Sequence, residues 1–202
     1  MEVNATAVKE LREKTGAGIM DCKKALAETG GSLDKAVDYL RQKGLAAAAK
    51  RADRVATEGA VGAYVHPGGK IGVLVEINCE TDFVARTAEF QAILKDVAMQ
   101  IAAANPRFVR REEVPAEESE KEKAIYRQQA LESGKPEKVV EKIVEGKMDR
   151  FYSEVCLLEQ PFIKEPERKV SDIVNDAAAR LRENLQVRRF ARYNLGEAIQ
   201  KN

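Results

Sequence analysis

The chain has 202 residues, 44% of them hydrophobic, which is enough to bury a core and to form two modules of unequal size. Its 34 Lys and Arg residues are balanced by 33 Asp and Glu residues, whereas a nucleic-acid-binding protein usually carries a basic surplus. No apolar run approaches the roughly 20 residues of a membrane span and no signal-peptide pattern opens the chain, so we expect a cytoplasmic protein with no membrane and no direct nucleic-acid contact.

Cysteine and histidine usage argues against the common forms of metal and catalytic chemistry. Cys22, Cys79 and Cys156 are widely spaced and form no Cys-x-x-Cys pair, which indicates buried, reduced thiols. The single histidine, His66, lies in a Pro-Gly-Gly turn, where a solvated side chain is expected. A His-based metal site usually needs more than one histidine, and a Ser-His pair would have to use this one. We therefore expect no metal, no cofactor and no catalytic constellation.

Residues 4–43 predict three short amphipathic helices. Gly-containing turns at 15–18 and 29–31 separate them, Ser32 is a suitable N-cap for the third, and Gly44 closes it. The apolar positions at helical spacing are Val8, Leu11, Ile19, Cys22, Ala25, Leu26, Leu33, Ala36, Val37 and Leu40. We expect a helical domain over residues 1–44, followed by a charged helical linker over residues 45–56.

From Glu58 the hydrophobic period changes from helical to alternating. Val61, Ala63 and Val65 alternate with Ala60, Gly62 and Tyr64, and after a Pro-Gly-Gly turn Ile71, Val73, Val75 and Ile77 share one face. This pattern predicts a β-hairpin with one buried face.

The remaining residues predict helices and one more strand. A helix carries the stripe Phe90, Ile93, Leu94, Val97, Ala98 and Ile101, and a second, long helix carries Val140, Ile143, Val144, Met148, Phe151 and Val155. Between them, the charged residues 110–123 indicate a solvated loop entering a helix. Residues 159–166 indicate an extended linker, because Pro161 and Pro166 disfavour helix before them.

The C-terminal part predicts a last helix capped by Ser171 and a final strand over residues 187–195. This strand would complete an antiparallel sheet with the hairpin. The expected fold class is α+β: an N-terminal three-helix domain, a helical connector, and a core over residues 57–202 in which a small antiparallel sheet packs with helices.

Two motifs have a functional and a structural interpretation. The Gly-rich turn at 15–18 could hold a phosphate ahead of a helix, but it lacks the strand and the Lys-Ser/Thr of a P-loop, so an interhelical turn is favoured. Arg188, Phe190 and Arg192 alternate on the last strand and could form an RNA surface. Solvated arginines flanking a packed ring are the favoured interpretation on a nearly neutral protein.

Phe83 stands at the end of the second hairpin strand, between Asp82 and Val84, and also has two interpretations. Asp82 could cap the next helix, so that Phe83 becomes its first core residue and packs on Phe90 seven residues later. Residue types alone favour this interpretation. Alternatively, Phe83 is a protruding anchor, a rigid ring beside a carboxylate that fills a partner's pocket.

Two long stretches and several shorter ones resemble translation elongation factor Ts. The long stretches are residues 11–26 (LREKTGAGIMDCKKAL) and 77–86 (INCETDFVAR). Later segments follow in the family's order, namely residues 134–136, the helix through 145–148, residues 160–162, and residues 188–196 (RRFARYNLG). The resemblance covers nearly the whole chain, and it implies a guanine-nucleotide exchange factor for elongation factor Tu.

The resemblance also implies which residues contact that partner. The N-terminal domain would be of the ubiquitin-associated type and would dock on the partner's nucleotide-binding domain through Arg12, Ile19 and Met20. The segment Thr81, Asp82, Phe83 and Val84 would displace Mg²⁺ from the partner's GDP site, with Phe83 inserted between two of its helices. The resemblance therefore reverses the preference for Phe83 as a core residue. Gln100 stands where some members have a histidine, and is a further candidate for partner contact.

The family has long and short forms, and this chain resembles the short form. Long members carry an inserted coiled-coil dimerisation element, for which this chain is expected to be too short. Short forms can pair through the C-terminal strand region, so that two exchange factors bind two partners. Arg189, Ala191 and Tyr193 are the candidate interface residues here. Because Ala191 replaces a cysteine that could join two subunits, this dimer would be non-covalent.

Overall fold

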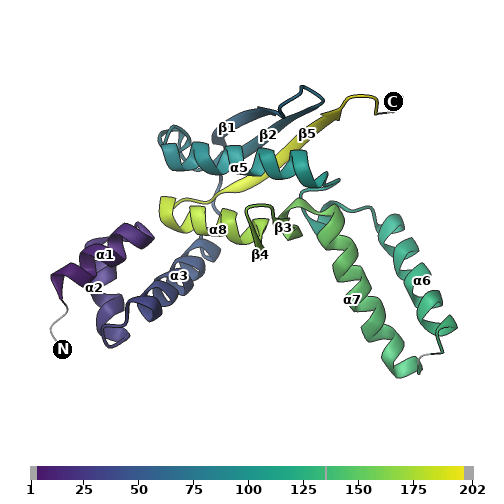
Figure 1. Cartoon of the computed structure of the whole chain (residues 1–202), viewed down its shortest axis with the longest axis horizontal. Coiled ribbons are helices and arrows are strands. Elements are labelled where there is room, and N and C mark those ends of the chain that lie inside the picture. Colours follow the sequence, from purple (N-terminus) through teal and green to yellow (C-terminus); the bar gives the residue numbers. More distant parts are fainter. Residues whose placement is uncertain (1–3, 135, 198–202) are drawn as a thin grey trace. The chain divides into compact units, whose positions relative to one another are not determined.

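The computed structural model describes residues 4–134 and 136–197, which form an α+β fold, as the sequence predicts (Figure 1). Two compact units are present. One combines the N-terminal segment up to Ala60 with Ile77–Ile93 and Val174–Gln186. The other contains Val61–Glu76, Leu94–Ile173 and the segment from Val187 onward. Among the described residues, no helix is both long and apolar enough to cross a membrane.

The N-terminal helices are α1 (Ala5–Thr15), α2 (Ile19–Glu28) and α3 (Leu33–Ala49). They bury a small cluster formed by Leu11, Cys22, Ala25, Leu26 and Ala36. Gly16 ends α1 in the left-handed conformation, with a φ of 65° that favours glycine. The Gly-rich segment at 15–18 is therefore an interhelical turn.

The predicted end of the third helix at Gly44 is wrong, because α3 continues without a break to Ala49. Gly44 instead lies where its helix approaches Ala179 closely. A Cβ atom at this position would lie only 3.1 Å from the Cβ of Ala179. Ser32 does occupy the N-cap position of α3, but its side chain makes no capping hydrogen bond.

The predicted hairpin consists of β1 (Glu58–Val65) and β2 (Ile71–Cys79), and β5 (Gln186–Asn194) completes a three-stranded sheet in the order β1-β2-β5. The apolar residues at alternate positions of β2 are buried: Val73, Val75, Ile77 and Cys79. Leu74, on the other face of β2, is 48% exposed. The prediction of a hairpin with one buried face is therefore confirmed.

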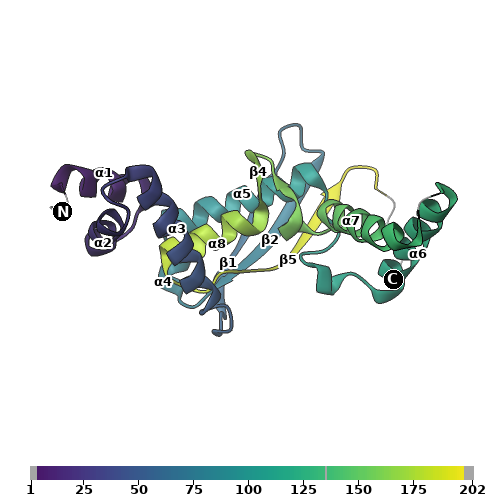
Figure 2. The same ribbon diagram turned by 90° about the horizontal axis from the view of Figure 1, so that it is seen from below.

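Helix α5 (Ala88–Ala104) packs against the inner face of this sheet (Figures 1 and 2). On β1 the inward position is Gly62, where an added Cβ would come within 2.7 Å of Leu94 on α5. The two valines of β1 therefore face outward, and Val61 and Val65 are 65% and 67% exposed. The predicted stripe of α5 is buried from Phe90 to Ile101.

Helices α6 (Ala116–Glu132) and α7 (Glu137–Val155) lie side by side and antiparallel (Figures 1 and 2). The solvated loop predicted at 110–123 is therefore wrong for most of its length, since only a 3-10 turn (Arg111–Glu113) precedes α6. Residues of α6 and α7 share a buried cluster, formed by Val114, Ala130, Val140, Val144, Met148, Phe151 and Cys156.

A second small sheet replaces the extended linker predicted at 159–166. A 3-10 turn (Leu157–Glu159) leads into β3 (Pro161–Phe162), which pairs antiparallel with β4 (Glu165–Lys169). Helix α8 (Val170–Leu181) follows directly. Ser171 lies inside α8 and does not cap it. Instead, the carboxylate of Asp172 accepts a hydrogen bond of 3.0 Å from the backbone N–H of Lys169.

Candidate functional site

The end of β2 places an aromatic ring on the surface. Phe83 belongs to the four-residue helix α4 (Asp82–Ala85) and is 77% exposed, whereas Phe90 is fully buried. The interpretation of Phe83 as a core residue packed on Phe90 is therefore wrong. Its two successors, Val84 and Ala85, are 9% and 6% exposed. These two buried side chains anchor α4 to the core, and Phe83 is the one large apolar side chain of α4 that faces solvent.

Thr81, rather than Asp82, caps this short helix. Its backbone is extended, and its Oγ1 accepts a hydrogen bond of 3.4 Å from the N–H of Val84. Asp82 is the first helical residue, where a negative charge is favourable. Its carboxylate also pairs with Arg86 at 2.7 Å. At the other end of α4, the side-chain amide of Gln91 donates to the carbonyl of Ala85 at 2.8 Å.

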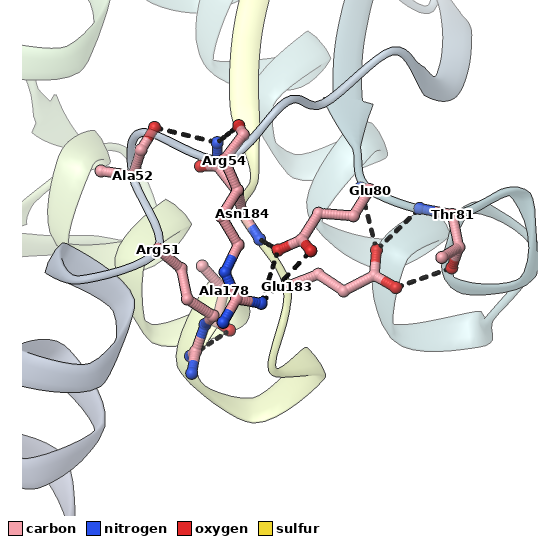
Figure 3. A network of polar contacts seen from close by, with 8 residues as sticks. All are labelled: Arg51, Ala52, Arg54, Glu80, Thr81, Ala178, Glu183 and Asn184. Atoms are coloured by element: carbon pink, nitrogen blue, oxygen red, sulfur yellow. Dashed lines mark hydrogen bonds and ion pairs between the residues drawn. The ribbon is translucent and has the colours of Figure 1, made fainter.

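Glu183 holds the segment that precedes Phe83 (Figure 3). One carboxylate oxygen accepts hydrogen bonds from the backbone N–H groups of Glu80 and Thr81, at 3.0 and 3.1 Å. The other accepts from the hydroxyl of Thr81 at 2.6 Å. Hydrogen bonds to an ionised acceptor are stronger than those between neutral groups.

Glu80 and Asn184 extend these contacts to the segment after α3 (Figure 3). The backbone N–H of Asn184 donates to the Glu80 carboxylate at 2.8 Å, and Arg54 approaches the same carboxylate at 3.3 Å. These contacts lower the pKa of Glu80, the Asn184 N–H contributing most. The side-chain amide of Asn184 donates to the carbonyls of Ala52 and Arg54, at 3.0 and 2.7 Å.

Glu183 and Asn184 carry no signal in the sequence that would connect them with Phe83. Glu183 and Thr81 are 102 positions apart. The chain turns back after α8 because Arg182 adopts a left-handed conformation, with a φ of 60°. This conformation is uncommon for residues other than glycine. Without a glycine at this position, the sequence gives no indication of the turn.

The candidate contact residues of the N-terminal helices are exposed. Arg12 lies on the outer side of α1, and Ile19 and Met20 occupy the first turn of α2, where they are 57% and 76% exposed. Exposed apolar side chains at two consecutive positions resemble the central part of a protein interface.

Gln100, in contrast, lies in the interior and is fully buried. Its side-chain amide donates to Gln160 Oε1 and to the carbonyl of Pro161, at 3.1 and 3.2 Å. Its oxygen accepts from the N–H of Ile163 at 2.8 Å. Because the amide and the oxygen are both engaged in contacts around β3, Gln100 is dropped from the candidate contact surface.

The candidate interface residues on β5 differ in their surroundings. Tyr193 is 70% exposed, Ala191 is partly buried, and Arg189 pairs with Glu76 of β2 at 2.6 Å. Arg192 points inward, where its guanidinium donates to the carbonyl of Ala102 on α5. Only 12% of the Arg192 side chain is exposed. The alternative RNA surface therefore loses one of its three residues.

The thiols and the histidine lie where the sequence predicts. Cys22, Cys79 and Cys156 are free and buried. Burial raises the pKa of the Cys156 thiol to about 11 and also raises the pKa of the Cys79 thiol. His66 is exposed in its turn and lies 3.0 Å from the hydroxyl of Tyr64. Within residues 4–134 and 136–197, no group of three or more His, Cys, Asp or Glu side chains could hold a metal ion.

Comparison with known proteins shows the family. A family model described as elongation factor TS matches residues 4–197. The chain is 62% identical over 200 residues to an elongation factor Ts of Desulforamulus reducens. The aligned region covers 99% of this chain and 92% of the relative. The chain is 63% identical over 199 residues to the elongation factor Ts of Heliobacterium modesticaldum, with 98% and 93% covered. The chain therefore belongs to the elongation factor Ts family, the nucleotide exchange factors of translation elongation.

Proposed function

We propose that this chain binds elongation factor Tu in its GDP form, disturbs the Mg²⁺ and phosphate site of that partner, and so promotes GDP release. The observation that carries the proposal is Phe83, an aromatic side chain 77% exposed on a short helix whose neighbours are buried or hydrogen-bonded. A rigid exposed ring fills a pocket at a small entropic cost, because few side-chain rotations are lost on binding.

Phe83 and Asp82 act on the nucleotide site of the partner. A ring inserted between two packed helices displaces them in a discrete step, since packed cores do not deform continuously. GDP is held largely through phosphate and Mg²⁺ contacts, so moving a ligand of the metal weakens the nucleotide efficiently. Asp82 and its partner Arg86 bring two charges next to the ring. Thr81 and Val84 hold the ring from either side, as cap and buried anchor.

The N-terminal helices provide a second contact. Arg12, Ile19 and Met20 dock on the nucleotide-binding domain of the partner and supply binding free energy away from the metal. The exchange factor lowers the affinity of the partner for GDP by some factor. By linkage, its own affinity for the nucleotide-free partner must exceed its affinity for the GDP form by the same factor. A thousandfold effect requires about 4 kcal/mol of differential binding. Two or three hot-spot residues, each contributing about 2 kcal/mol, can supply it.

The exposed face of the sheet supports a non-covalent homodimer in a complex of two exchange factors and two partners. Val61, Val65, Leu74 and Tyr193 are exposed apolar or aromatic side chains of the three strands. Arg189 and Ala191 complete the proposed interface on β5. The exchange factor needs no cofactor of its own, acts in the cytoplasm without contacting nucleic acid or membrane, and catalyses no chemical step.

Two measurements test the proposed function. Release of a fluorescent GDP analogue from elongation factor Tu, followed by stopped flow, is expected to accelerate with increasing concentration of this chain and then to saturate. An unchanged release rate would contradict the proposal. Size-exclusion chromatography with mass measurement of the nucleotide-free complex reports the partner and the stoichiometry, and a one-to-one complex would contradict the homodimer.

A further inference from the structure

We propose that Glu183 is a positioning residue for Phe83: it fixes the segment 80–84 in the free protein, so that the ring meets the partner already oriented. The proposal rests on the proposed function, because it assigns Phe83 the contact with elongation factor Tu. It adds a residue from the turn after α8 that neither the sequence motif nor the family comparison indicates. We refer to Glu183 and its contacts with Glu80 and Thr81 as the clamp.

The donors around Glu183 match the acceptor that its carboxylate provides. Two backbone N–H groups and one hydroxyl converge on the carboxylate of Glu183, at 3.0, 3.1 and 2.6 Å. A carboxylate only accepts hydrogen bonds, so it suits three donors. A glutamine would turn its NH₂ group toward one of them. Glu183 is half-buried, and its bond to the N–H of Glu80 is partly shielded from water.

Thr81 connects Glu183 to the helix that carries Phe83. Its hydroxyl proton is committed to Glu183, which leaves the lone pairs of Oγ1 for the N–H of Val84 at 3.4 Å. This bond caps α4, whose second residue is Phe83. An isolated four-residue helix is unstable in water. The clamp and the buried side chains of Val84 and Ala85 therefore determine where the ring stands.

The residue after Glu183 supports the same segment. Asn184 binds the Glu80 carboxylate through its backbone N–H and the carbonyls of Ala52 and Arg54 through its side chain. Two consecutive residues after α8 thus hold both the segment before Phe83 and the segment after α3 (Figure 3). These contacts all lie within one compact unit of the structure. Preorganisation of this kind raises affinity by reducing the entropy lost on binding.

The clamp is tested first in the free protein, without the partner. Hydrogen exchange of the Glu80, Thr81 and Val84 amides is expected to accelerate about tenfold in Glu183→Ala, and by less in Glu183→Gln, which keeps one acceptor. Thr81→Val is expected to affect Val84 most, and Thr81→Ser to restore it. Glu145→Ala, on the exposed side of α7, is the matched control. Unchanged exchange in both Glu183 variants would overturn the clamp.

The role in nucleotide release is tested with a double-mutant cycle. Glu183→Ala is expected to slow GDP release about fivefold in the wild-type background, but less than twofold in Phe83→Ala, because Glu183 acts through the ring. Equal slowing in both backgrounds would overturn the positioning role and indicate a separate contact. If Phe83→Ala released GDP as fast as wild type, the proposed function of the ring would fail. Faster amide exchange in Glu183→Ala would then still support the clamp itself.

Discussion

The end of β2 and the interior around β3 differ in the kind of side chain that each exposes. At the end of β2, the aromatic Phe83 is 77% exposed, while the polar Gln100 near β3 is fully buried. Both depart from the rule that apolar residues lie inside and polar residues outside. In each case the surrounding hydrogen bonds explain the position. Hydrogen-bond partners surround the side-chain amide of Gln100. Phe83 belongs to a segment whose polar groups donate hydrogen bonds to Glu183.

The difference has a functional meaning. Burial of a satisfied polar group specifies how the core is arranged. Exposure of a supported apolar group loses hydrophobic free energy in the isolated protein and recovers it only when a partner covers the ring. Substitutions in the two regions should therefore affect different quantities, namely stability around β3 and nucleotide release at Phe83.

The largest effect is expected for Gln100→Leu. The buried Gln160 side chain and the backbone groups of Pro161 and Ile163 would lose the fully buried Gln100 amide as their partner, which should lower the free energy of unfolding by about 3 kcal/mol. Urea unfolding measures this loss. The substitution should leave GDP release by the folded protein unchanged. A stability equal to wild type, or a direct loss of partner binding, would show that Gln100 belongs to the surface after all.

The reactivity of the Cys156 thiol reports the burial of the interior, and measuring it requires no substitution. A thiol pKa of about 11, compared with an ordinary value of 9.0, implies a thiolate fraction near pH 8 about a hundredfold below that of an exposed cysteine. The neutral thiol also favours the folded state, so this contribution to stability is complete below pH 9 and is lost as the pH rises through 11. Titration with a thiol reagent checks this, and rapid labelling of the native protein would contradict it.

The substitution Met20→Ala allows the roles of two exposed apolar residues, Met20 and Phe83, to be compared. Met20 is nearly as exposed as Phe83, at 76% against 77%, but we propose that it acts in the docking of the N-terminal helices. We expect about a tenfold weaker affinity for the partner, with an unchanged maximal rate of GDP release. The concentration dependence of release separates the two quantities. A lower maximal rate would place Met20 in the same role as Phe83.

The smallest effect is expected at Glu80, which belongs to the segment that precedes Phe83. Its pKa is lowered from 4.5, chiefly by the Asn184 N–H, so its contribution to stability is present above pH 4.5 and is lost as the pH falls through the lower, folded-state pKa. Glu80→Gln should remove this acid dependence, which amounts to less than about 1 kcal/mol for a partly exposed pair. Unfolding between pH 3 and 6 checks it, and identical acid limbs in both proteins would contradict it.

The sequence predicts the elements whose residues are close together in the chain. Alternation along β2 and the stripe of α5 follow from local periodicity, and the buried residues agree with both. The charged residues 110–123 predict a loop that enters a helix, but they do not indicate that α6 begins as early as Ala116. Charges of α6 find partners in pairs such as Arg107–Glu118 and Arg127–Glu141. These partners are 11 and 14 positions apart, beyond the three or four positions that separate neighbours on a helix, so helical spacing does not indicate them.

The candidate site shows the same division. The family motif identifies Thr81, Asp82, Phe83 and Val84, but residue types alone favour a buried Phe83. The exposed position depends on Glu183 and Asn184, more than 100 residues later in the chain, and on a left-handed Arg182 that redirects the backbone. Long-range hydrogen bonds of this kind leave no periodic trace in the sequence, and only the three-dimensional structure brings them together.

The central claim is that an exposed, supported ring drives nucleotide release. The most direct test is the rate of GDP release from elongation factor Tu at a saturating concentration of Phe83→Ala, with Leu131→Ala as a control for an exposed apolar residue on α6. We expect Phe83→Ala to release GDP about thirtyfold more slowly than wild type, equivalent to about 2 kcal/mol, with stability unchanged within about 0.5 kcal/mol. A rate equal to that of wild type in a normally folded Phe83→Ala protein would contradict the claim.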